Sequence, residues 1–179
     1  MPFRTAAALG LFMALPVAAQ DTPAPAAMPA QGQPAMAATI QSPEGASLGT
    51  ARLMTTPSGM TVVTLDLTGL PPGIRGVHLH ETGDCTAPDF ESAGGHLAHG
   101  KDHGVMADGG PHPGDLPNLH VPEGGVMTVE YFAPGLTAEM VADADGSAII
   151  LHEQADDYTS QPSGNAGARI GCGIFAEAG

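Results

Sequence analysis

The chain alternates apolar and polar residues over short segments, and this period of two is typical of β-strands with one buried face. Residues 48–55 and 60–68 both alternate in this way. They are separated by Pro57-Ser58-Gly59, a turn sequence, so we expect them to form an antiparallel pair. The other candidate strands are residues 37–41, 76–80, 126–132, 147–152 and 168–175.

No segment offers ten residues with the 3.6-residue period of an amphipathic helix. Helix is therefore expected only as a turn or two, near residues 134–140 or around Asp156. Many short strands separated by Gly- and Pro-rich turns predict an all-β fold, an antiparallel sandwich or barrel.

The first 36 residues lack this strand pattern. Residues 1–19 have a basic start, an apolar run and a small-residue end at Val17-Ala18-Ala19, as in a secretory signal peptide cleaved near Ala19. The run is too short to predict a membrane span. Residues 20–36 are rich in Pro, Ala and Gln and predict a disordered tether. We therefore expect a β-domain over residues 37–179, exported to the periplasm or beyond.

The composition is acidic, with 19 Asp and Glu against 5 Lys and Arg and a formal net charge of −14. Cleavage after residue 19 would remove Arg4 and no acid, which makes the net charge −15. Such a charge argues against nucleic acid and anionic membrane surfaces as partners. The two cysteines, Cys85 and Cys172, lie in no CxxC spacing, so an exported chain favours a disulfide over a thiol metal site.

All eight histidines lie within residues 78–152, and six of them lie within residues 78–115. The latter stretch is rich in Gly, Pro and Asp and has no helical period. A long polar loop of this kind inside a compact domain usually carries function. The chemistry that clustered imidazoles share is metal ligation.

The spacing of these residues predicts a site for two metals. His78 and His80 flank one residue of a candidate strand, so both rings point to the same face. His152 ends another candidate strand and, taken alone, would more often be a buried core histidine than a ligand. Three imidazoles and one carboxylate form a closed tetrahedral set that suits zinc: His96, His103, His112 and Asp115.

Several motifs together resemble the copper/zinc superoxide dismutase family, and in particular its exported bacterial branch. They are Gly76-Val77-His78-Leu79-His80-Glu81 with Gly83-Asp84-Cys85, then Gly95-His96, His103, His112-x-x-Asp115, Leu151-His152-Glu153, and the segment from Gly164 to Gly173 that contains Arg169. The resemblance covers roughly residues 37–176. It implies an eight-stranded antiparallel Greek-key β-barrel or sandwich with long metal-binding and active-site loops.

The resemblance also implies roles for individual residues. The implied copper ligands are His78, His80, His96 and His152, and the implied zinc ligands are His96, His103, His112 and Asp115. His96 would bridge the two metals as an imidazolate and would act with Arg169, which meets superoxide beside copper. Asp156 would link a copper ligand to a zinc ligand, and Cys85 would pair with Cys172. The implied reaction is the disproportionation of superoxide to dioxygen and hydrogen peroxide.

Some features leave alternatives open. No lysine lies between His152 and Arg169, so we expect weak electrostatic attraction of superoxide. His99 and His120 match no ligand position; they are surface residues or, with Met28 and Met36, an accessory copper-capture site. A non-catalytic envelope module that binds or delivers copper and zinc is the alternative function, although such a module would not need the arginine. A monomer and a homodimer both remain open.

Overall fold

The computed structural model describes Met1 and residues 36–178. The expected signal peptide, apart from Met1, and the expected tether up to residue 35 lie outside the described residues. Residue 36, which we placed in the tether, instead begins the first strand. The elements are β1 (Met36–Gln41), β2 (Ser47–Thr55), β3 (Thr61–Leu67), β4 (Gly73–Arg75), β5 (Val77–His80), the 3-10 turn η1 (Glu91–Ala93), β6 (Leu119–Val121), β7 (Met127–Ala133), α1 (Ala138–Val141), β8 (Ala148–His152), β9 (Arg169–Ile174) and β10 (Ala176–Glu177).

The seven strands expected from the sequence are all present, and each end lies within one residue of its predicted position. The pattern missed β4, β6 and β10, because strands of two or three residues are too short for an alternation to be recognised. It also missed η1. The single helical turn α1 overlaps the segment where we expected one, whereas Asp156 lies in a loop.

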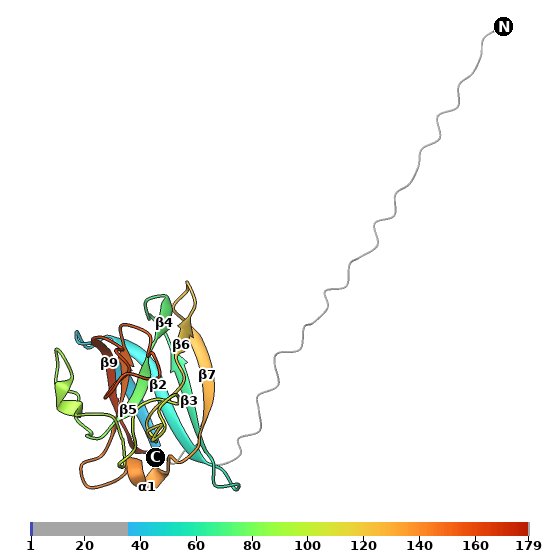
Figure 1. Cartoon of the computed structure of the whole chain (residues 1–179). Coiled ribbons are helices and arrows are strands. Elements are labelled where there is room, and N and C mark those ends of the chain that lie inside the picture. Colours follow the sequence, from blue (N-terminus) through green and yellow to red (C-terminus); the bar gives the residue numbers. More distant parts are fainter. Residues whose placement is uncertain (2–35, 179) are drawn as a thin grey trace. The chain divides into compact units, whose positions relative to one another are not determined.

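The main sheet is antiparallel and runs in the order β5-β8-β9-β1-β2-β3-β7, with β10 added beside β1. Only Gly76 separates β4 from β5, so this one segment pairs with β6 through β4 and with β8 through β5. After β3 the chain crosses to β5 at the opposite end of the strand order, which makes a Greek-key connection. The curled, half-closed barrel in Figure 1 confirms the predicted all-β fold.

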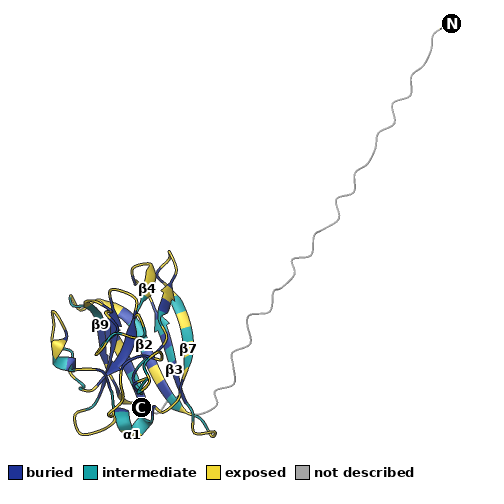
Figure 2. Ribbon diagram, viewed as in Figure 1, coloured by how far each residue is buried: buried dark blue, intermediate teal, exposed yellow. Residues whose placement is uncertain are grey.

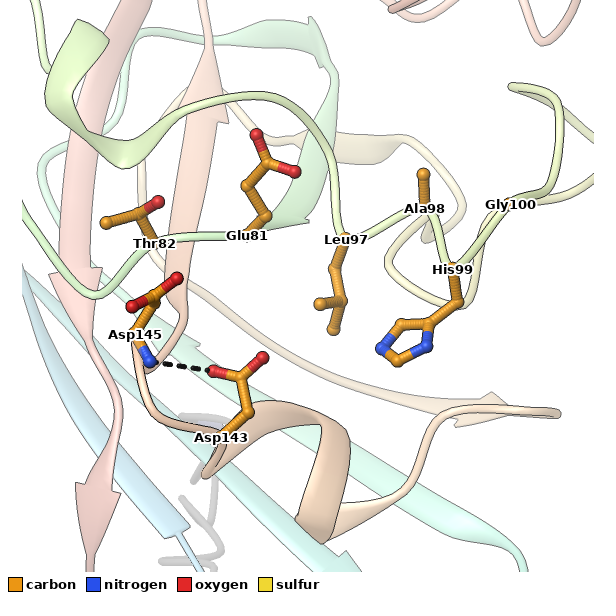
Figure 3. A pocket seen from close by; sticks show the side chains of 8 residues that line it. All are labelled: Glu81, Thr82, Leu97, Ala98, His99, Gly100, Asp143 and Asp145. Carbon is orange, nitrogen blue, oxygen red and sulfur yellow. Dashed lines mark hydrogen bonds between the residues drawn. The ribbon is translucent and has the colours of Figure 1, made fainter.

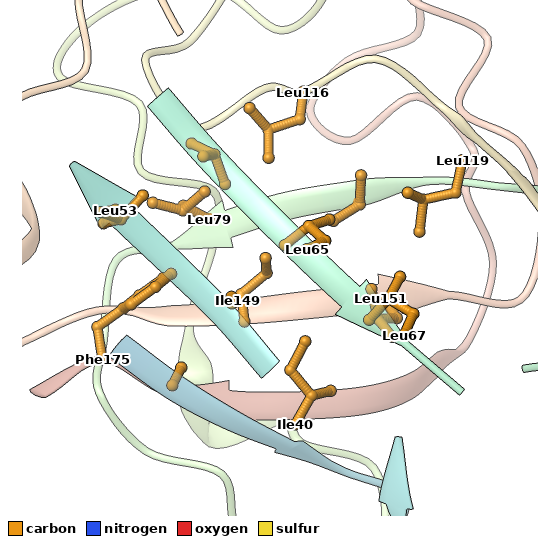
Figure 4. Packing of buried hydrophobic residues seen from close by; sticks show 14 of the residues in the cluster. Ile40, Leu53, Leu65, Leu67, Leu79, Leu116, Leu119, Ile149, Leu151 and Phe175 are labelled. Atoms are coloured by element: carbon orange, nitrogen blue, oxygen red, sulfur yellow. The ribbon is translucent and has the colours of Figure 1, made fainter. Parts of the chain in front are cut away.

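The inner face of the curled sheet holds the hydrophobic core (Figure 4). On β2 and β3 the alternation turns Leu53, Val63 and Leu65 inward, where each is at most 1% exposed. Leu79 of β5 and Ile149 of β8 belong to the same core, although these two strands lie at the other end of the strand order. Burying each of these side chains contributes about 1.5–3 kcal/mol to folding.

The strands differ in how their outer faces are covered. Along β7 half-buried residues alternate with exposed ones until Ala133, which is typical of a strand with one solvated face (Figure 2). In contrast, every residue of β5 and β8 is buried. Both faces of these two strands are therefore covered, one by the core and the other by the loops that follow β5 and β8.

The helix α1 begins after Thr137, whose side-chain oxygen accepts a hydrogen bond from the N–H of Met140 at 3.4 Å. Its residue Val141 packs into the main core. In the part of the chain that the structure describes, no helix has the length and apolar character needed to cross a membrane.

Candidate metal centre

Strand register places three histidines on the covered outer face of β5 and β8. His78 lies two residues before His80 on β5 and opposite Ile150 on β8. Since side chains on a strand alternate between faces, His152 shares the face of Ile150. His152 pairs in turn with Arg169 at the start of β9. The sheet thus brings three of the implied copper ligands and the arginine together.

The loop after β5 folds back across that strand and supplies the fourth histidine. The N–H of Leu79 donates to the carbonyl of Gly114 at 2.9 Å, and the N–H of Leu97 donates to the carbonyl of Leu79 at 2.8 Å. A Cβ on Gly114 would lie 2.6 Å from that Leu79 oxygen, so this close approach requires glycine. His96 is thereby held beside His80, with which it forms an isolated β-bridge.

Four histidines converge on one point and form what we call the first group: His78, His80, His96 and His152. Each offers a ring nitrogen, and these nitrogens lie within 4.8 Å of one another. The four residues are at most 6% exposed. Within the described part of the chain, His78 Nδ1 and the Nε2 atoms of the other three have no hydrogen-bond partner. Buried polar atoms are nearly always paired, so four such nitrogens at one point fit a metal ion.

A second group comprises His96, His103, His112 and Asp115. The Nδ1 atoms of its three histidines lie 3.0, 3.1 and 3.2 Å from the same oxygen, Oδ1 of Asp115. The other oxygen of Asp115 accepts the N–H groups of Gly104 at 2.8 Å and of His112 at 3.1 Å, which fix the carboxylate. Three imidazole nitrogens and one carboxylate are a ligand set that suits zinc in a closed tetrahedral site.

His96 belongs to both groups through opposite atoms of one ring. Its Nδ1 faces Asp115 in the second group, and its Nε2 is one of the unpartnered nitrogens of the first group. The ring stacks on that of His78, with centroids 4.0 Å apart. One ring can therefore offer a ligand atom to each group.

Asp156 lies within hydrogen-bond distance of one histidine in each group. One carboxylate oxygen lies 2.8 Å from Nε2 of His78, and the other lies 3.0 Å from Nε2 of His103. The residue is only 3% exposed. A carboxylate in this position fixes the orientation of both rings and leaves their Nδ1 atoms directed at the two groups.

Burial sets the protonation of the first group. Desolvation is the main cause that lowers the pKa of His80 to about 2, of His96 to about 4 and of His152 to about 3. Repulsion between neighbouring imidazoles adds to the effect in each case. These rings are therefore neutral at pH 7, which is the form that binds metals.

The second group behaves differently because it contains a carboxylate. Burial lowers the pKa of His103, but hydrogen bonds to Asp115 and Asp156 outweigh this and raise it to about 9. The same bonds hold the pKa of both carboxyl groups well below the usual range, even though burial acts in the opposite direction. In the metal-free protein His103 is therefore protonated at pH 7 and pairs with two ionised carboxylates, so a metal ion that binds the second group would displace this proton.

Arg169 is held beside the first group by two backbone carbonyls. Its Nη1 donates to the carbonyl of Phe90 at 2.6 Å, and its Nη2 donates to that of Gly94 at 2.8 Å. The arginine lines a pocket together with His80, Gly95, His96, His152, Pro162, Ser163 and Gly167. It also lines a neighbouring hollow that contains Asp89 and Glu91. A small anion in the first pocket would thus meet the histidines and the guanidinium together.

Cys85 and Cys172 form the expected disulfide, with Cα atoms 5.8 Å apart and a sequence separation of 87 residues. The bridge packs in a small second core with Phe90 and Ile150. It joins β9 to the loop whose carbonyls hold Arg169. Sequence reasoning missed these carbonyls, because a backbone oxygen carries no residue-type signal.

His99 and His120 lie outside both groups. His99 is exposed and lines a separate surface hollow with Glu81, Asp143 and Asp145 (Figure 3). Glu81 uses one of its carboxylate oxygens to accept the N–H of Gly95. His120 is exposed on β6. Met36, suggested for accessory copper capture, is 4% exposed within the core, and Met28 lies outside the described residues.

Comparison with known proteins gives the same family that the motifs suggest. Residues 47–175 match the family described as copper/zinc superoxide dismutase. Superoxide dismutase [Cu-Zn] 2 of Aquifex aeolicus is 40% identical over 139 residues, which is 74% of this chain and 81% of that protein. The superoxide dismutase-like protein YojM of Bacillus subtilis is 42% identical over 139 residues, 74% of this chain and 71% of that one.

A solved structure supports the same conclusion. The crystal structure of a superoxide dismutase-like protein from Bacillus subtilis matches with a TM-score of 0.73 and 40% sequence identity, covering 77% of this chain and 96% of that one. The cofactors of this family are copper and zinc, and the two groups described above can hold metal. The chain belongs to the copper/zinc superoxide dismutase family.

Proposed function

We propose that this protein catalyses the disproportionation of superoxide. Two superoxide anions and two protons would give dioxygen and hydrogen peroxide. The observation that carries the proposal is the set of four buried, unpartnered imidazole nitrogens next to the guanidinium of Arg169. Family membership supports it, although relatives include proteins named superoxide dismutase and one named superoxide dismutase-like.

The residues of the two groups would have different roles in the reaction. Copper held by the first group would supply a one-electron redox couple, and zinc held by the second would keep His96 in place. His96 would take up a proton at Nε2 in one half of the cycle and return it to the developing peroxide in the other. Because its Nδ1 faces the second group, this ring can exchange a proton without leaving its position.

Arg169 would bind the anion in front of the first group. Its pocket also contains Ser163 and Pro162 from the loop after β8. The hydrogen bonds to the carbonyls of Phe90 and Gly94 fix the guanidinium, so little side-chain entropy is lost when the anion binds. A charged donor held in this way favours a small anion over neutral dioxygen.

The alternative function is a module that binds or delivers copper and zinc without turnover. It would need the two groups but not an arginine fixed at the mouth of the pocket. We further propose that the protein is exported to the periplasm or beyond, which fits both its disulfide and the bacterial relatives. Superoxide would be its small-molecule partner, and the proposal does not depend on whether the protein is a monomer or a homodimer.

Superoxide disproportionation by the mature domain tests the proposal. The copper- and zinc-loaded protein should be compared with the zinc-only protein and with an equal amount of free copper, all in the presence of a chelator. Activity confined to the copper-loaded protein would support the dismutase. Tight metal binding with a background rate would favour the binding or delivery module instead.

A further inference from the structure

Two carboxamide side chains pair with the backbone of the metal centre. Oε1 of Gln161 accepts the N–H of His103 at 2.8 Å, and Nε2 of Gln161 donates to the His103 carbonyl at 2.9 Å. Asn118 does the same for Asp156, with its Oδ1 accepting the N–H at 2.8 Å and its Nδ2 donating to the carbonyl at 2.9 Å. The same two-bond pattern therefore occurs at two residues of one buried cluster.

This pattern has a physical reason. His103 and Asp156 both lie in loops, so their backbone groups have no partners in a strand ladder. Backbone polar groups near a buried site need hydrogen bonds. A carboxamide offers one acceptor and one donor side by side, like a peptide group, and can satisfy both groups of a single residue. A carboxylate or an apolar side chain cannot do so.

The two pairings are linked through the rings. Nε2 of His103 lies 3.0 Å from an oxygen of Asp156, so a continuous chain of hydrogen bonds runs from Gln161 through His103 and Asp156 to Asn118. At its far end, the N–H of Asn118 donates to the hydroxyl of Tyr158 at 2.7 Å. Both ends of this chain are therefore anchored by side chains outside the two metal-binding groups.

Gln161 also lies between the two groups. Its backbone directly precedes Pro162 and Ser163, which line the pocket in front of the first group. Its side chain holds His103 of the second group, and its Nε2 makes an additional bond to the carbonyl of Thr159 at 3.1 Å. A shift of His103 would therefore displace Gln161 and, with it, Pro162 and Ser163, which form one wall of the pocket.

We propose that Gln161 is a positioning residue, which holds His103 in place for metal binding and couples occupancy of the second group to the shape of the anion pocket. This inference rests on the proposed assignment of the two groups to copper and zinc. Gln161 would not contact metal or substrate. It would act through the backbone of His103 on one side and through Pro162 on the other.

The test replaces Gln161 by methionine, which has a similar length and shape but no comparable hydrogen-bonding capacity. Gln161 is exposed, so the fold does not depend on it for core packing. The matched control is Gln154→Met, since Gln154 is exposed in the same loop and its carboxamide makes no hydrogen bond among the described residues. Thermal unfolding of the metal-free proteins checks that both variants fold.

The first readout is the zinc dissociation constant, measured by competition with a metal-binding indicator. We expect Gln161→Met to weaken zinc binding at least tenfold, which is the usual cost of losing a residue that orients a ligand. Cobalt in place of zinc should show a changed visible spectrum in this variant. Equal zinc affinities in Gln161→Met and Gln154→Met, whether both normal or both reduced, would overturn the positioning role.

The second readout is the affinity of azide, a small anionic probe, for the copper-loaded protein with and without zinc. In the wild type, zinc should change the azide dissociation constant by about fivefold, a typical coupling between two sites. In Gln161→Met that change should be at least halved. The absence of a zinc effect in the wild type would overturn the coupling. Neither readout needs turnover, so both remain decisive if the protein proves not to be a dismutase.

Discussion

One carboxylate oxygen of Asp156 lies 2.8 Å from Nε2 of His78, and the Nδ1 atom on the other side of that ring is unpartnered. Since the carboxylate accepts a hydrogen bond from Nε2–H, it selects the tautomer in which Nδ1 carries a free lone pair. The other oxygen of Asp156 lies 3.0 Å from Nε2 of His103 and fixes the orientation of that ring. A single acid thus orients one histidine in each group.

Replacement of Asp156 should therefore weaken metal binding without removing a ligand. We expect Asp156→Asn to raise the zinc dissociation constant by about 10- to 100-fold, because one amide cannot accept from both rings. Isothermal titration or indicator competition measures the effect. Asp157→Asn is the control, since Asp157 is an exposed neighbour that accepts only loop N–H groups and the Asn165 amide. Equal losses in the two variants would contradict the prediction.

Replacement of Arg169 should slow turnover while both metals stay bound. We expect Arg169→Ala to lower kcat/KM for superoxide by about 10- to 100-fold, because the pocket loses its fixed positive charge. Metal content is measured in parallel by elemental analysis. Arg52→Ala removes the same charge at the surface, where Arg52 pairs with Asp66. An unchanged rate in the Arg169 variant would rule out the anion-binding role.

The acidic side chains beside Arg169 should repel superoxide and so lower kcat/KM. Glu91 and Asp89 line the hollow next to the arginine, and both are exposed. We expect Glu91→Gln to raise kcat/KM by about twofold at low ionic strength and to have little effect at high salt, because salt screens exposed charges. Glu130→Gln makes the same charge change at an exposed position of β7, four strands away from β9 in the sheet order. A gain that persists at about 1 M salt would point to a steric cause.

Acid should destabilise the metal-free protein. The pKa of His80, His96 and His152 is lowered in the folded state, so the unfolded chain binds more protons below its imidazole pKa of about 6.5. Stability is then full above pH 6.5 and falls as the pH drops toward the folded values. His103 acts in the opposite direction, because its pKa is raised to about 9 and its protonated form stabilises the fold more as the pH falls. After this partial offset, the free energy of unfolding in urea should be lower at pH 5.0 than at pH 7.5 by roughly 2–4 kcal/mol. The metal-loaded protein should show a smaller difference, because bound metal competes with protons.

The candidate ligands could be predicted from the sequence because their chemistry is carried by residue type and by short-range spacing. His96, His103 and His112 stand out in the sequence, since three imidazoles within one polar loop have few roles other than metal binding. The apolar run Ala148–Leu151 also indicates that His152 ends a buried strand. The structure adds the geometry, above all that the two nitrogens of His96 face different groups.

The supporting contacts could not be predicted in the same way. The carbonyls of Phe90 and Gly94 that fix Arg169 are backbone atoms, which every residue possesses. Asn118 and Gln161 are of types common in any loop, and their partners are 38 and 58 residues away along the chain. Such contacts depend on how the long loops after β5 and β8 pack against each other, which a local sequence pattern does not predict.

The disulfide of Cys85 and Cys172 has a consequence for where the protein can work. It ties β9 to the loop that supplies both carbonyl acceptors of Arg169. In a reducing compartment this tie is absent, and the arginine loses the brace that sets its position. Export into an oxidising compartment would then form the disulfide and fix the arginine, so that the anion pocket is complete only where the two sulfur atoms are oxidised.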